Sequence, residues 1–306
     1  MKRHRKFYKS GFQHLCQKSA DNGIIFIELL DFIVLFTNIC VKAVKHNVCI
    51  IAICIMFNHF HIEAAFENER IMARFMNGLT SVVARAQNRQ YNTKGQVFKK
   101  PYKNASKYGK RAVKDNFIYI GNNPVEKMIV NHAEDYRWNF IKYLDSADPF
   151  SEPIDFQTAS ASLIDLVKKV KELHEDGKAI GYKTLGKKWF SLDDKERNQL
   201  VDFIISTYNV IDKKTVMNLF GSYEGLTATL NAITGSEYDI NDDLSKEDYR
   251  KYIKMREISR EEGVDLHKIH FRQGTQRDAS LSRLISRCIN EVQASEYEIK
   301  KFFHLK

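Results

Sequence analysis

Two neighbouring segments decide the fold, Val48-Cys-Ile-Ile-Ala-Ile-Cys-Ile-Met-Phe57 and, after Asn58, His59-Phe-His-Ile-Glu-Ala-Ala-Phe66. The first is an unbroken apolar run rich in β-branched residues, which predicts a buried central strand. Asn58 is a suitable turn residue, so residues 59–66 can run back beside that strand as its partner. The two segments therefore predict a hairpin at the centre of a sheet.

The flanking patterns predict the rest of this sheet. They indicate a strand at 11–18, a helix at 26–45, a helix at 67–91, a loop and strand at 94–108, and a helix at 113–121. The order β-α-β-β-α-β followed by a helix is that of the ferredoxin-like fold. We therefore predict an α+β domain with an antiparallel sheet and helices on one face.

The composition changes near Pro149 and Pro153, which predicts a boundary between a first domain, 1–148, and a second, 149–306. Residues 1–150 carry 23 Lys and Arg against 12 Asp and Glu, whereas the rest of the chain is close to neutral. A basic domain of this kind most often binds a polyanion such as nucleic acid. Every residue assigned to chemistry below precedes the boundary, so we expect the first domain to hold the whole chemical site.

The second domain is predicted to be helical. Its patterns indicate helices at 159–174, 193–208, 214–230, 246–261 and 280–303. Within the last of these, residues 280–289 and 294–303 are consistent with a helix-turn-helix, with Ser295 capping its second helix, and equally with a plain helical pair. Trp189 is interpreted as a core residue.

Cysteine and apolar patterns exclude several classes of protein. None of the five cysteines forms a CxxC pair, so we expect reduced core residues and no zinc site. The only membrane candidate, Ile24–Val41, contains Glu28 and Asp31, and we interpret it as a buried amphipathic helix. No signal peptide is recognised. These features predict a cytoplasmic protein without a membrane partner.

His59 and His61 form the first candidate chemical feature. On a strand, residues i and i+2 point to one face, so two imidazoles stand together while Phe60 points into the core. This pair is half of a divalent metal site and needs further groups to fix the tautomers. Structural histidines are the alternative interpretation.

The second feature is a long basic stretch. No Asp or Glu occurs between Arg70 and Lys114, and Tyr91, Phe98, Tyr102 and Tyr108 are interspersed among the cations. Cations that neutralise phosphates, together with rings that stack on bases, are what single-stranded nucleic acid requires. The candidate DNA-binding residues are Arg74, Arg85, Arg89, Lys94, Lys99, Lys100, Lys103, Lys107, Lys110 and Arg111.

The third feature is Tyr119 with Asn123. Four residues apart on a helix, they share one face, where Asn123 can offer an amide oxygen to a metal beside the phenol. The alternative is a tyrosine that packs at the end of a helix stopped by Pro124.

Together these features resemble a known family. The chain resembles the REP-associated tyrosine transposases, members of the HUH endonuclease superfamily, in its basic stretch and in two motifs, Asn58-His59-Phe60-His61 and Tyr119-Ile-x-x-Asn123-Pro124-Val125. Three flanking segments are also similar to the family: Gly11-Phe-Gln-His14, Gly95-Gln-Val-Phe98 and Asp135-Tyr136-Arg137-Trp138. The resemblance covers about residues 5–145. The chain departs from it at Phe57, where the family usually has Pro, and at Gly121 and Glu126.

The resemblance implies a mechanism and a set of residues. His59, His61 and Asn123 would be metal ligands, and Tyr119 the nucleophile of a single-stranded DNA transposase that nicks and rejoins DNA through a 5′-phosphotyrosine. It implies a bacterial, nucleoid-associated protein, acting on single-stranded or hairpin DNA as a monomer or homodimer. The ligand set suits Mg²⁺ or Mn²⁺, the latter better matched to nitrogen ligands. The alternatives are a catalytically inactive nucleic-acid-binding regulator and a nickase of the replication-initiator type.

Overall fold

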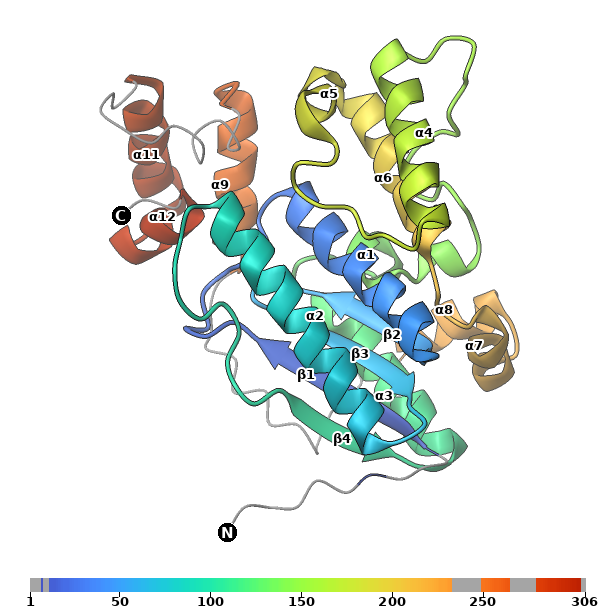
Figure 1. The fold of residues 1–306 in the computed structure, drawn as a ribbon. Helices are drawn as coiled ribbons and strands as arrows, with labels where there is room; N and C mark the ends of the chain where they lie inside the picture. The colour runs from blue at the N-terminus through green and yellow to red at the C-terminus, as the bar shows by residue number, and fades with distance from the viewer. Residues whose placement is uncertain (1–6, 8–10, 233–248, 265–278, 304–306) are drawn as a thin grey trace.

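The computed structural model describes residues 7, 11–232, 249–264 and 279–303 (Figure 1). Its single sheet contains four antiparallel strands in the order β2-β3-β1-β4. This order is ferredoxin-like, so the predicted α+β fold with its antiparallel sheet is confirmed. The strands are β1 (Phe12–Lys18), β2 (Cys49–Ile55), β3 (His59–Ala65) and β4 (Lys103–Lys107).

Three long helices cover this sheet. The two predicted to share one face, α1 (Leu29–His46) and α2 (Glu69–Gln90), lie in front of it in Figure 1, and α3 (Gly109–Glu126) lies behind it. The Phe66 ring, which follows β3, contacts Phe75 of α2. Three short 3-10 helices follow α3, namely η1 (Ala133–Asp135), η2 (Arg137–Asn139) and η3 (Lys142–Leu144).

The polar residues inside the apolar segment 24–41 have structural roles. The carboxylate of Asp31 accepts hydrogen bonds from the backbone N–H of Ile27 and Glu28 at 2.9 and 2.8 Å, which caps α1. It also accepts from the hydroxyls of Tyr91 and Tyr182 at 2.6 and 2.7 Å. Burial nevertheless raises the pKa of Asp31. The predicted buried helix is thus confirmed, and no described helix is long and apolar enough to cross a membrane.

Helix α3 is longer than the sequence predicts. We expected it to end near Gly121, but it continues through Pro124 to Glu126, so that expectation is wrong. Proline in a helix interior removes a backbone donor, which usually ends the helix. Here α3 is buried between the sheet and helices of the second half of the chain, and this packing outweighs the missing hydrogen bond.

The described residues after 148 contain only helices as regular secondary structure, as predicted. The prediction of a single helix at 214–230 is wrong, because the structure has two helices there. Gly221, with φ 88°, ends the first, and the Ser222 hydroxyl caps the second by accepting a hydrogen bond from Gly225 N at 3.1 Å. Residues 246–248 of another expected helix lie outside the described residues. The helices are α4 (Ala161–Glu175), α5 (Gly186–Ser191), which was not predicted, α6 (Asp194–Tyr208), α7 (Lys213–Phe220), α8 (Tyr223–Ala232), α9 (Tyr249–Glu261), α11 (Ala279–Val292) and α12 (Glu296–Phe302).

Two side-chain predictions for this half are confirmed. Ser295 caps α12, because its hydroxyl accepts from Glu298 N at 3.2 Å while the Glu298 carboxylate accepts from Ser295 N at 2.7 Å. Trp189 is buried. All five cysteines are free and four are buried, as expected for reduced core residues.

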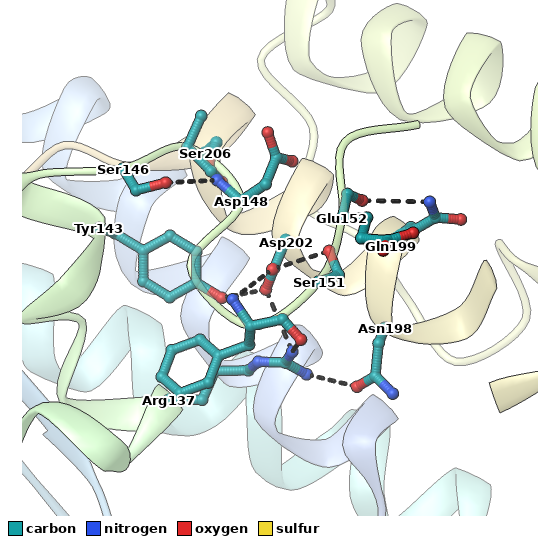
Figure 2. Close-up of polar contacts among 12 residues, drawn as sticks. Arg137, Tyr143, Ser146, Asp148, Ser151, Glu152, Asn198, Gln199, Asp202 and Ser206 are labelled. Carbon is teal, nitrogen blue, oxygen red and sulfur yellow. Dashed lines mark hydrogen bonds and ion pairs between the residues drawn. The ribbon is translucent and has the colours of Figure 1, made fainter. Parts of the chain in front are cut away.

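The segment that joins the two halves is held against α6 (Figure 2). Asp202 of α6 is fully buried and accepts from Tyr143 OH, Phe150 N and Ser151 Oγ at 2.5, 2.9 and 2.9 Å. Its ion pair with Arg137 spans 3.2 Å. Through Asp202, α6 thus binds residues on both sides of position 148. The domain boundary at that position stays a prediction.

Helices α7 and α8 also pack on the outer side of α3. The Asn122 side chain donates to Leu230 O at 2.9 Å, and the rings of Phe117 and Phe220 lie 5.1 Å apart. A Cβ at Gly121 would lie 2.9 Å from a Leu230 methyl group, so a larger residue at this position would force the Leu230 side chain to shift. The second half of the chain therefore fixes the helix that carries Tyr119.

Candidate active site

Strand β3 places three ionisable side chains on one face of the sheet. His59, His61 and Glu63 alternate with Phe60 and Ile62, and all five are fully buried. Phe60 contacts Phe98 on the apolar side, which α1 and α2 cover. The pair His59–His61, with ring centroids 4.8 Å apart, therefore faces α3, on the side predicted from the i, i+2 spacing.

Asn58 sets the orientation of His59. The Asn58 side-chain nitrogen donates to Asn22 O at 2.8 Å, so its oxygen is the atom that lies 2.6 Å from His59 Nδ1. Since that oxygen can only accept, Nδ1 carries the hydrogen in the neutral imidazole. Nε2 is then the unprotonated nitrogen, which is the form that a metal requires.

His61 has a partner that the sequence reasoning did not single out. His14 of β1 lies with its Nε2 2.8 Å from His61 Nδ1, and the register pairs His14 with Glu63 across the strands. Both residues are fully buried on the same face as His59. The sequence does contain a signal for Glu63, because Glu63 continues the i, i+2 alternation of His59 and His61. It contains none for His14, whose position beside His61 follows from the register between β1 and β3.

Helix α3 brings Tyr119 to this face. Its ring centroid lies 5.7 Å from that of His14 and 5.8 Å from that of His61, both edge to face. The side chain is only 5% exposed. Of the predicted residues, the structure thus brings together Tyr119, His59 and His61, which are far apart in sequence.

Asn123 and Asn116 extend the polar surface of α3. Their spacing from Tyr119, four residues on and three back, puts them on its side of the helix. Both are buried, and within the described part of the chain the side-chain oxygens of both lack a hydrogen-bond partner. A buried amide oxygen without a donor is costly and is a suitable ligand for a hard cation.

The donor set fits the implied metal. It consists of two imidazole nitrogens, one with its tautomer fixed, and one buried amide oxygen. Among the described residues no group of three or more His, Cys, Asp or Glu side chains is arranged to hold a metal ion. The predicted ligand set is of a different kind, because it has only two histidines and its third ligand is the amide oxygen of Asn123.

The structure divides the candidate DNA-binding residues between two sides of the sheet. Arg74, Arg85 and Arg89 are exposed on α2, on the side opposite the histidines. Lys94, Lys99 and Lys100 are exposed in the segment before β4. The remaining four, which we call the α3-side cations, lie on β4 or in the first turn of α3: Lys103, Lys107, Lys110 and Arg111.

Two of the α3-side cations, Lys110 and Arg111, lie in an unfavourable electrostatic position. The first turn of α3 contains no acidic residue, and cations at a helix N-terminus oppose the helix dipole. Arg111 forms an ion pair with Asp115 that spans 3.8 Å between exposed side chains and contributes little. An anion such as a phosphate would relieve this repulsion. Lys107, unlike the other three, is buried.

Only one of the four interspersed rings is well exposed. Phe98 is buried against Phe26 and Phe60, so its predicted stacking role is wrong. The Tyr91 hydroxyl is bound to Asp31, and Tyr102 is half-buried. Tyr108, at the N-cap of α3, is 65% exposed and stands among the α3-side cations.

Fold and site together define an α+β protein with a buried His-x-His pair facing a tyrosine helix. No family model and no curated protein matches the chain. Among solved structures it is similar to a REP-associated tyrosine transposase bound to a REP hairpin, at 14% identity and a TM-score of 0.38, over 47% of this chain and 84% of that one. At this level of similarity, the chemistry of the site has to be judged from its own residues.

Proposed function

We propose that this chain is a metal-dependent single-stranded DNA transposase with Tyr119 as its nucleophile. The observation that carries the proposal is the approach of the Tyr119 ring to His61, with His59 beside it on the same face of the sheet. A phenol next to a metal-competent histidine pair is an arrangement suited to attack on a phosphodiester.

The proposed reaction exchanges one phosphoester bond for another. The Tyr119 oxygen forms a bond to phosphorus as the bond to the 3′ oxygen breaks, which leaves the 5′-phosphate on the tyrosine. The phenol loses a proton and the 3′ oxygen gains one. Attack by a 3′-OH on the phosphotyrosine restores the phenol and rejoins a strand, so no phosphoester bond is consumed by hydrolysis.

His59, His61 and Asn123 would hold the divalent ion, Mg²⁺ or Mn²⁺. When bound, the ion would neutralise charge on the phosphoryl oxygens and so assist attack by a phenol whose ordinary pKa is about 10. Asn58 holds the His59 ring in the tautomer that ligation needs, through the 2.6 Å contact at Nδ1. If His61 is to ligate through Nε2, its Nδ1 donates to His14, so His14 acts as a positioning residue.

Single-stranded or hairpin DNA is the proposed substrate. The exposed α3-side cations can neutralise phosphates near the start of α3, and the Tyr108 ring is exposed where a base can stack. Lys110 and Arg111 lie in the first turn of the helix that carries Tyr119, Tyr108 is its N-cap residue, and Lys103 lies on β4.

Covalent capture tests the proposal. The full-length chain is incubated with hairpin-bearing single-stranded DNA and Mn²⁺, and DNA-linked protein is separated on a denaturing gel. We expect an adduct that needs the metal, persists in Tyr108→Phe and is absent in Tyr119→Phe. An adduct in Tyr119→Phe would contradict the assignment of the nucleophile.

A second candidate is a nucleic-acid-binding regulator without catalysis. The burial of Tyr119, His59 and His61 favours it, because a strand has to reach the phenol before attack. The same gel distinguishes the two candidates. A regulator gives no adduct with any divalent metal, although the chain binds single-stranded DNA.

A further inference from the structure

A second site lies away from the histidine strand, in a cavity of about 630 Å³. Its described walls come from the start of α1, residues 135–150, α5, α6 and α9, so both halves of the chain contribute. None of the residues assigned to the transposase chemistry lines it. Its size falls within the range of pockets that bind small ligands.

Aromatic rings form a large part of the cavity wall. Trp138, Phe150, Trp189 and Phe190 all line it, and the first and third are the only tryptophans of the chain. Trp138 is fixed by stacking on Phe32, with ring centroids 4.7 Å apart. Phe190 is 36% exposed, so a flat ligand can reach its ring.

Two of the four arginines in the wall are already engaged. Arg137 donates to Asn198 at 2.9 Å and pairs with the buried Asp202, as Figure 2 shows. Arg197 pairs with Asp194 at 3.0 Å and lies over the Trp189 ring. These contacts fix the two guanidinium groups as parts of the wall.

Arg256 and Arg260 of α9 are not engaged in this way. They are one helical turn apart, both line the cavity, and neither makes a hydrogen bond or ion pair with another residue in the described ranges. Burial lowers the pKa of Arg256. The charge of Glu28 acts against this shift, as do Tyr136 and Asp31 to a smaller extent, while the neighbouring charge of Arg260 adds to it. Two adjacent guanidinium groups that make no hydrogen bond or close ion pair with a described residue favour an anion, and a phosphate matches their geometry.

We propose that this cavity binds a nucleotide, with the phosphate on Arg256 and Arg260 and the base against the aromatic wall. Carboxylates at Glu28, Asp135 and Asp194 can accept hydrogen bonds from the N–H groups of a base. A base has to be unpaired to leave a duplex and lie against this wall. The proposal does not depend on catalysis by Tyr119, so either can fail without the other.

Both tryptophans lie at this site, so intrinsic fluorescence reports on it directly. The full-length chain without divalent metal is titrated with each of the four deoxynucleoside monophosphates and with a short single-stranded oligonucleotide. We expect saturable quenching, weakened about tenfold or more in Arg256→Gln and in Arg260→Gln. Lys254→Gln is the matched control, because Lys254 is exposed on the same helix and does not line the cavity.

Competition identifies the source of the nucleotide. If the oligonucleotide displaces a bound monophosphate, the site takes a nucleotide of a strand; if only monophosphates bind, it takes a free nucleotide. Either result supports the proposal. It is overturned if nothing quenches the fluorescence, if inorganic phosphate alone competes as well as a nucleotide, or if Arg260→Gln, an exposed change expected to fold normally, binds as tightly as Lys254→Gln.

Discussion

The two faces of the sheet are equally buried and chemically opposite. On one, Phe60 and Ile62 pack under α1 and α2 in an ordinary apolar core. On the other, His59, His61 and Glu63 of the same strand lie under α3 with His14. Because buried polar groups cost free energy unless they are paired, a face of this kind reduces stability compared with an apolar one. The α1–α2 side therefore stabilises the fold, whereas the α3 side holds, at a cost in stability, the polar groups on which the proposed chemistry rests.

The largest effect should come from removing residues 149–306. The sequence suggested that residues 1–148 suffice for chemistry, but α7 and α8 cover the outer side of α3 through Phe220 and Leu230. Deletion exposes that apolar surface, so we expect an insoluble fragment or one without cooperative unfolding. Circular dichroism and thermal melting of the fragment test this. A soluble, cooperatively folded fragment that forms the adduct would show that the polar face needs no cover from the second half.

Two adjacent residues of β3 separate the roles of the two faces. Ile62→Ala should lower the free energy of unfolding by about 2–5 kcal/mol, because it leaves a cavity in the apolar core, yet should retain metal-dependent cleavage at a temperature where it is folded. His61→Ala should abolish that cleavage. Urea unfolding and adduct formation are measured on both variants. The division between the faces is wrong if Ile62→Ala is inactive while folded, or if His61→Ala still cleaves.

A smaller effect compares the cations on the two sides of the sheet. Replacing Lys103, Lys110 and Arg111 together with Gln should flatten the dependence of DNA affinity on salt, by about 0.7 in the log–log slope for each phosphate that the variant no longer neutralises. The same triple change at Arg74, Arg85 and Arg89 of α2 is the control and should leave the slope nearly unchanged. Equal effects would mean that DNA binds along both sides.

The sequence predicts the central hairpin and the site histidines because their signals are local. An apolar run of β-branched residues and the i, i+2 spacing of His59 and His61 need only the geometry of one strand. The helix through Pro124 and the break at Gly221 were missed, because tertiary packing decided the first and a single positive φ the second. A lone glycine in a helical pattern is a weak signal of an end.

The rest of the site depends on contacts that a sequence does not display. His14 reaches His61 only through the register of β1 and β3, and the approach of α8 to Gly121 joins residues about a hundred positions apart. The cavity under α9 likewise combines side chains from Glu28 to Val264. The basic stretch looked continuous because sequence order does not reveal on which side of the sheet α2 lies.

Mapping the covalent adduct tests the central claim most directly. The full-length chain is trapped with single-stranded hairpin DNA and Mn²⁺, digested with nuclease and protease, and the peptide that retains a nucleotide is sequenced by mass spectrometry. We predict that the nucleotide is found on Tyr119, next to the histidine face of the sheet. A nucleotide on Tyr108 or Tyr102, or trapping that proceeds equally without divalent metal, would contradict the account.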